Sequence, residues 1–184
     1  MSKSTEDINL GQFCASRDSL ISPISRFDIY EPFALGGFEY ATDGVVCVRV
    51  PTAADDATGK LPPVGALPWE QEGDTVEVSC ERKVQKCPWC DGSGTEFEWQ
   101  KILPERPCEQ CHGSGKISHP PYVLLGGQWF AGRYIRPLSE LPNARLVCPP
   151  DIAADSITPR LIRFDGGEAM LMPCEPPKDN EERS

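Results

Sequence analysis

Two eight-residue stretches, CPWCDGSG from Cys87 and CEQCHGSG from Cys108, constrain this chain more than any other feature of its sequence. Together they have the form C-x2-C-x17-C-x2-C, which lies within the spacing of structural zinc sites. Zinc favours a tetrahedron of four ligands, and one Cys-x-x-Cys turn can direct two thiolates to a single point. We therefore predict one structural Zn²⁺ whose ligands are Cys87, Cys90, Cys108 and Cys111.

The glycines that follow each cysteine pair favour a metal site over a redox site. Gly92 and Gly94, and again Gly113 and Gly115, allow the backbone to fold back tightly, so that its N–H groups can donate to the thiolates. A dithiol redox enzyme instead places Cys-x-x-Cys at the start of a helix, and glycines oppose helix formation. Redox catalysis is therefore the least favoured of the functions considered for this chain.

The remaining cysteines and a histidine are expected to take no part in the site, with one open case. Nine cysteines, four of them in paired units, fit metal-bound thiolates in a reducing cytoplasm better than a disulfide scaffold. Cys80 lies seven positions before Cys87, and the sequence leaves open whether it contributes to the metal site. His112 is expected to be an exposed loop residue, because four thiols already fill a tetrahedral shell. The other cysteines are expected to be small buried apolar residues: Cys14, Cys47, Cys148 and Cys174.

Composition and turn signals predict an α+β, mostly β domain that the cysteine repeats interrupt. Nineteen prolines and sixteen glycines favour short elements with many turns. The Asp43-Gly44 dipeptide predicts a hairpin between strands at 37–42 and 45–50, with Asp43 as a turn residue. We expect further strands at 75–85, 95–103, 122–125, 144–148, 161–164 and 168–172, helices near 12–20 and at 128–141, and a linker over 51–70. We expect the chain to consist of the first half of the α+β domain (1–74), a zinc hairpin (75–118), the second half of the domain (119–174) and a flexible tail (175–184).

Charge and hydropathy limit the partners that the chain can have. The formal net charge of −10 disfavours contact with phosphate backbones, and residues 81–116 contain as many cationic as anionic side chains. Nucleic acid therefore remains a possible but disfavoured partner. No run of roughly 18 apolar residues predicts a membrane span. The N-terminal MSKSTEDINL lacks the apolar core of a secretory signal, so we expect a cytoplasmic protein.

The two stretches resemble the Cys-x-x-Cys-x-Gly-x-Gly repeats of the DnaJ-type zinc finger. In that family four repeats form two zinc sites in a β-hairpin module, so the two repeats here, over residues 87–115, imply one site and half of the module. The family's module helps to hold unfolded polypeptides, which implies a protein partner. The His-Pro-Asp triplet of the J-domain is missing, since His119 precedes Pro120; the resemblance therefore implies no chaperone ATPase as a partner.

The flanking segments resemble a domain of the bacterial DNA sliding clamp. FEYATDGVVCVRVP (38–51) is similar to a clamp hairpin, and WFAGRYIRPLSELP, ARLVCP and RFDGGEAMLMPC follow in the order of a clamp helix, strand and terminal strand. The resemblance implies one clamp-like domain interrupted by the zinc hairpin. A clamp ring needs several such domains with basic helices, whereas this chain supplies one, with Arg133 and Arg136 on the expected helix.

The sequence favours a non-enzymatic interaction protein. It contains none of the common nucleotide-binding, serine hydrolase or zinc peptidase motifs. Trp89, Phe97 and Trp99 either pack beneath the zinc hairpin or form an apolar face, and they are the candidate partner-binding residues. We therefore expect a zinc-binding protein-interaction module, for which a chaperone-like activity is one version. The alternative is a clamp-like accessory protein associated with nucleic acid. The oligomeric state is left open.

Overall fold

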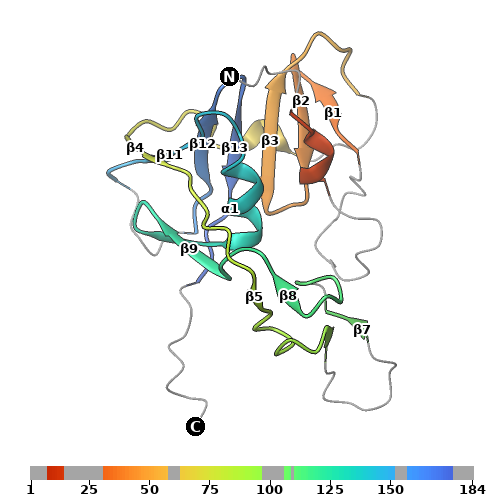
Figure 1. Cartoon of the computed structure of the whole chain (residues 1–184). Helices are drawn as coiled ribbons and strands as arrows, with labels where there is room; N and C mark the ends of the chain where they lie inside the picture. Colours follow the sequence, from red (N-terminus) through yellow and green to blue (C-terminus); the bar gives the residue numbers. More distant parts are fainter. Residues whose placement is uncertain are drawn as a thin grey trace.

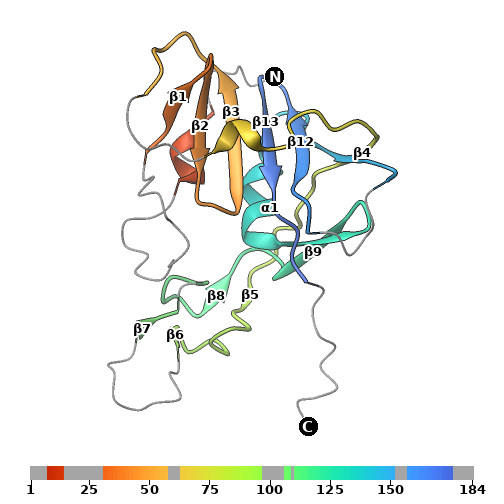
Figure 2. The same ribbon diagram turned by 180° about the vertical axis from the view of Figure 1, so that it is seen from behind.

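The computed structural model describes residues 8–14, 31–57, 63–96, 106–108, 110–151 and 157–175, and the chain is α+β and mostly β, as predicted. The body is a seven-stranded antiparallel sheet in the order β1-β2-β3-β13-β12-β11-β4 (Figures 1 and 2). None of the helices in these ranges is long and apolar enough to cross a membrane. The strands of the sheet are β1 (Phe33–Leu35), β2 (Phe38–Thr42), β3 (Val46–Pro51), β4 (Asp74–Glu77), β11 (Arg145–Cys148), β12 (Arg160–Phe164) and β13 (Gly167–Leu171).

The sheet combines strands from both sides of the cysteine repeats. β3 pairs with β13, and β4 pairs with β11, so each half of the chain completes the other. β4 lies at residues that the sequence assigned to the zinc hairpin, but it is an edge strand of the main sheet. We call the segment from Gln85 to Ser118, which carries both cysteine pairs, the module; it follows β4 in the chain and lies below the body in Figure 1.

The hairpin predicted around Asp43-Gly44 is confirmed as β2 and β3. The Asp43 carboxylate accepts hydrogen bonds from the backbone N–H groups of Val45 (2.9 Å) and Val46 (3.0 Å). Gly44 has a φ of +93°, a left-handed conformation that glycine adopts without steric cost. Asp43 is therefore a turn residue, as the sequence indicates.

Each face of the sheet is covered by a separate apolar core. On one face, Val46 and Val48 pack with the 3₁₀ helix η2 (Leu10–Phe13), helix α1 (Gly132–Leu138) and the two-stranded ribbon of β9 (Tyr122–Leu125) and β10 (Gln128–Ala131). On the other face, Cys47 packs with Val64 and Trp69. The alternation of β3 predicts this division.

Two predictions about the elements are wrong. The helix expected over 128–141 begins only at Gly132, because Gln128–Ala131 form β10 and pair with β9 across the Gly126-Gly127 turn. The linker expected over 51–70 is not a linker from residue 63 onward. There Val64, in the 3₁₀ helix η3 (Val64–Ala66), and Trp69 are buried, and the Trp69 indole donates to Val64 O (2.8 Å).

Other predicted elements are shorter than expected or partly outside the described ranges. The strand expected at 75–85 is divided into β4 and β5 (Gln85–Lys86), and the one expected at 95–103 begins as β6 (Thr95–Glu96). Residues 97–105 and 15–20 lie outside the described ranges. The last three predicted strands are confirmed as β11, β12 and β13.

A joint of polar contacts attaches the module to helix α1. Arg136 donates to Ser118 Oγ, and Arg133 Nη1 donates to Gln110 Oε1 (3.0 Å). Gln85 Nε2 donates to His119 O (2.9 Å). Gly132 N–H donates to Pro121 O (2.9 Å), and a Cβ at Gly132 would overlap Pro120 O.

We predict that Gly132→Ala lowers the free energy of unfolding by about 1–3 kcal/mol, because the new methyl group must displace the backbone that leads out of the module. Gly65→Ala is the matched control: no atom of the described residues lies within 4 Å of its Cβ position, so we expect a change below about 0.5 kcal/mol. Urea denaturation of both variants measures the difference. Equal stability of the two would show that the joint is not closely packed.

Candidate metal centre

Four cysteine sulfurs converge on one buried point. The Sγ atoms of Cys87, Cys90, Cys108 and Cys111 all lie within 4.8 Å of one another. The distances are 3.9 Å from Cys87 to Cys108 and 3.7 Å from Cys90 to Cys111. A tetrahedron with metal–sulfur bonds of about 2.3 Å has edges of about 3.8 Å. Both of these distances match that edge, so the four thiols could hold one metal ion.

Two turns of the same geometry present the four thiols. In the first turn, Gly92 N–H donates to Cys87 O (3.0 Å), and Gly94 N–H donates to Cys90 Sγ (3.3 Å). The second turn repeats both bonds 21 residues later, from Gly113 to Cys108 O (3.2 Å) and from Gly115 to Cys111 Sγ (3.2 Å). The backbone thus supplies one N–H donor to one sulfur of each pair and lowers the cost of a buried thiolate.

The two turns also hold each other together. Cys87 N–H donates to Gly115 O (2.9 Å), and Cys108 N–H donates to Gly94 O (2.7 Å). Gly94 and Gly115 have φ angles of +83° and +69°, and a Cβ at either would overlap a carbonyl oxygen of the other turn. The last glycine of each motif is therefore required by close backbone approach as well as by its left-handed conformation.

The serine of each Gly-Ser-Gly has a role that sequence reasoning missed. Ser93 Oγ donates to Cys90 O (2.7 Å) and accepts from Thr95 N–H (3.2 Å). Ser114 makes the corresponding bonds to Cys111 O (2.6 Å) and from Lys116 N–H (3.3 Å). These bonds connect each turn to the short strand that follows it. The repetition of serine in both motifs was the available signal.

Burial and hydrogen bonds set the pKa values of the cysteines in opposite directions. Burial raises the pKa of Cys108 to about 12 and also raises that of Cys87. Burial opposes ionisation of Cys90 too, but hydrogen bonds from Gly94 N–H and from the neighbouring thiols outweigh it and lower the pKa of Cys90 to about 6. A positive ion at the centre would favour the thiolate form of all four.

The other candidate ligands lie outside this centre. Cys80 packs against the large core of the body, and the other four cysteines are buried or half-buried in the body. His112 is exposed, as predicted, with a φ of +49° at the turn. Within the described ranges, no second group of metal-ligating side chains occurs.

The three candidate partner-binding aromatic residues are described only in part. Trp89, between Cys87 and Cys90, is 41% exposed, and its ring centroid lies 6.4 Å from that of Tyr122 in β9. Phe97 and Trp99 lie outside the described residues. Sequence reasoning did not anticipate Tyr122 or Gln110 at the joint, because their partners are distant in the chain.

Comparisons of the chain with protein-family models, curated protein sequences and solved structures return no match. The resemblances to the DnaJ-type finger and to the sliding clamp therefore rest on the motif residues alone. Fold and site together define a mostly β protein with a seven-stranded antiparallel sheet and a four-cysteine centre that could hold one metal ion.

We predict that Gly94→Ala weakens metal binding more than Gly113→Ala. Gly113 has a φ of +80° but no atom within 3.4 Å of its Cβ position, so alanine there adds only left-handed strain of about 1–2 kcal/mol, or about tenfold in affinity. Gly94→Ala adds the overlap with Gly113 O and should cost at least about 100-fold. Chelator competition, followed by Co²⁺–thiolate absorption, measures both; equal losses would contradict the close approach of the turns.

Proposed function

We propose that this chain is a non-enzymatic, zinc-stabilised protein-interaction protein in which four thiolates hold one structural Zn²⁺. The tetrahedral spacing of four buried sulfurs supports this most directly. Four protein ligands leave no coordination position for water or substrate, which is the arrangement of structural zinc rather than catalytic zinc. Borderline-soft Zn²⁺ suits an all-sulfur donor set.

The size of the module's own core supports a structural role for the ion. Among the described residues, its buried apolar cluster consists of the four cysteines and Ile117. Such a cluster buries too little apolar area to fold a segment of this length by itself. Zinc binding would supply the missing free energy, as it does in other small zinc modules.

An interaction role is supported by where the module holds Trp89. The indole is only partly covered, and its neighbour Tyr122 belongs to the body, so a partner at the joint would contact both parts. The DnaJ-type resemblance, in which the module holds polypeptides, points to a protein as the partner. A chaperone-like activity is one form of this function.

The two alternatives have weaker support. Both Cys-x-x-Cys pairs lie in turns with left-handed residues rather than at the start of a helix, which disfavours a dithiol redox enzyme. A nucleic-acid-associated role gains one observation, because Arg133 and Arg136 of α1 reach the module and add cations to it. Duplex DNA binding at low salt that weakens as salt rises would favour that second candidate.

We predict that Cys108→Ser abolishes the binding of one zinc per chain and unfolds the module, while the sheet stays folded. Hydrogen exchange should accelerate over 85–96 and 106–117 and remain slow in β12 and β13, and chelation of the wild type should have the same effect. Cys80→Ser is the matched control and should retain one zinc, because Cys80 packs in the body. A module that stays protected after complete chelation would contradict a structural role for the metal.

The interaction itself is tested by photo-crosslinking in cells of the native host. A photoreactive amino acid at position 89 should capture a defined set of proteins, and adding Cys108→Ser should remove that set. The same probe at exposed Ile157 gives the background. If the probe captures the same proteins at position 89, at position 89 with Cys108→Ser, and at position 157, an interaction at the module is ruled out.

A further inference from the structure

An apolar strip runs from the module onto the outer face of the β9–β10 ribbon. We define it as Trp89, Tyr122, Leu124 and Trp129. Leu124 and Trp129 are direct cross-strand partners, so their side chains lie on one face of the ribbon. Tyr122 shares that face by strand alternation and contacts Trp89.

The strip faces away from the core. The residues of β9 and β10 that alternate with it, Val123 and Phe130, pack against the sheet. Leu124 is 53% exposed, which is unusual for a leucine in a paired strand beside two large aromatic residues. Trp89 is also exposed, and Tyr122 and Trp129 are half-buried. A contiguous, partly exposed apolar surface of this kind marks interaction sites.

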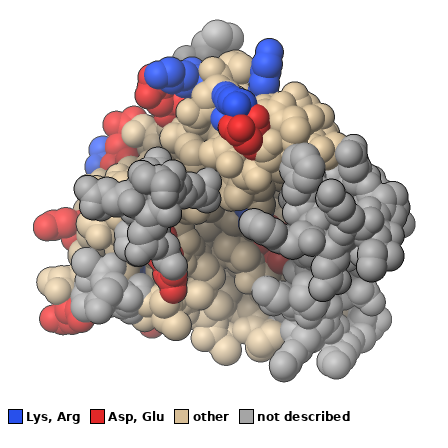
Figure 3. All heavy atoms as spheres, turned by 90° about the horizontal axis from the view of Figure 1, so that it is seen from below, with Lys and Arg blue, Asp and Glu red and all other residues tan. Residues whose placement is uncertain are grey.

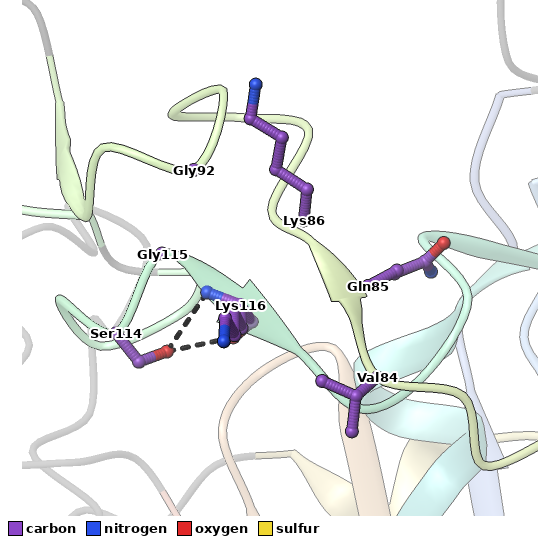
Figure 4. Close-up of a pocket in the computed structure, with 7 residues that line it drawn as sticks. All are labelled: Val84, Gln85, Lys86, Gly92, Ser114, Gly115 and Lys116. Carbon is purple, nitrogen blue, oxygen red and sulfur yellow. Dashed lines mark hydrogen bonds between the residues drawn. The ribbon is translucent and has the colours of Figure 1, made fainter.

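Two lysines stand directly opposite each other where the module joins the body. Lys86 in β5 pairs with Lys116 in β8 (Lys116–Ile117), and like charges in that position destabilise a strand pair. Lys86 Nζ is neutralised by Asp91 (2.7 Å), whereas Lys116 has no carboxylate partner among the described residues. Both lysines and Val84 are among the residues that line an open cavity of about 300 Å³. Figure 4 shows these side chains on β5 and β8 and in the segment that leads into β5.

The charges beside the strip are unevenly distributed. Arg133 in α1 follows Gly132, whose N–H donates to Pro121 O beside Tyr122 of the strip. Its guanidinium contacts Gln110 Oε1 and the ring and hydroxyl of Tyr134, a hydroxyl that also interacts with Asp43, and within the described ranges it makes no direct ion pair. Seen from below, Lys and Arg side chains gather toward the top of the view, several next to acidic groups, beside a broad area without charge (Figure 3). Residues 81–116 contain equal numbers of cationic and anionic side chains, whereas the chain as a whole carries −10, so an acidic partner is repelled less at this end than elsewhere on the chain.

We propose that the strip, together with Lys116 and Arg133, binds an extended segment of a partner protein in which apolar and acidic residues alternate. This inference rests on the proposed interaction function and specifies its partner. The apolar side chains of the segment cover the strip, and its carboxylates reach the two cations. A nucleic acid fits less well, because other nearby cations are already paired, Lys86 with Asp91 and Arg82 with Glu140, and a phosphate backbone needs many free ones.

Fluorescence anisotropy with three labelled eight-residue peptides tests the inference. In the first, phenylalanine and leucine alternate with aspartate; in the others, asparagine or lysine replaces aspartate. We expect the aspartate peptide to bind at least about tenfold more tightly than the lysine peptide at low salt, with a difference that shrinks as salt rises. Single-stranded oligothymidylate is the nucleic-acid probe.

Two variants with matched controls locate the binding. Leu124→Ser should weaken all binding peptides by about tenfold or more, because it removes exposed apolar area from the strip. Lys116→Glu should weaken only the aspartate peptide, by about fivefold. Ile157→Ser and Arg145→Glu are exposed substitutions of the same kinds outside the strip and should change neither affinity.

Each failure has a distinct meaning. Equal affinity for the aspartate and lysine peptides overturns the selection for acidic partners. If Leu124→Ser still weakens the binding of both peptides in that case, the proposed interaction function stands. Binding of none of the peptides overturns the inference, while crosslinking at position 89 still decides the proposed function independently. Tighter binding of oligothymidylate than of any peptide overturns it in favour of nucleic acid.

Discussion

The cost of holding four buried sulfurs within 4.8 Å of one another governs the rest of the module. As thiolates they repel one another, and as thiols they form a very small core with Ile117. A divalent ion at this point would resolve both problems, because its charge would offset the thiolates and its bonds would replace the missing apolar burial. The two glycine turns exist to satisfy this geometry, since each supplies an N–H to sulfur and each receives a backbone bond from the other.

The body stabilises itself by other means and gives the module a fixed place. Its sheet has an apolar core on each face, and strands from both halves of the chain close it. Helix α1 then contacts the module through Gly132 and its arginines, and Trp89 comes to lie against Tyr122. The partly exposed aromatic surface at the joint thus depends on both parts: the first cysteine turn carries Trp89, and the β9–β10 ribbon supplies Tyr122.

Features fixed by local chemistry could be predicted from the sequence, and those fixed by distant contacts could not. The cysteine turns and the Asp43-Gly44 hairpin depend on a few adjacent residues with special backbone angles, so their motifs were sufficient. The helix predicted from Gln128 failed because Gly126-Gly127 pairs β10 with β9, and this pairing overrides a helical spacing of aromatic residues. The burial of Trp69 could not be predicted from a segment rich in proline and glycine, because the residues that cover it come from strands on both sides of the module. Arg133 and Arg136 could be placed on a helix, but no local signal placed that helix beside the cysteines.

We infer that the four cysteines, and nothing else, hold one zinc ion in a closed shell. Zinc X-ray absorption spectroscopy of the purified full-length chain tests it most directly, because the number and kind of ligand atoms are measured at the metal. We predict four sulfur neighbours at about 2.3 Å and no nitrogen or oxygen. A spectrum with three or fewer sulfurs, or with a histidine nitrogen or a water oxygen in the shell, would contradict it and would reopen the question of catalysis at this site.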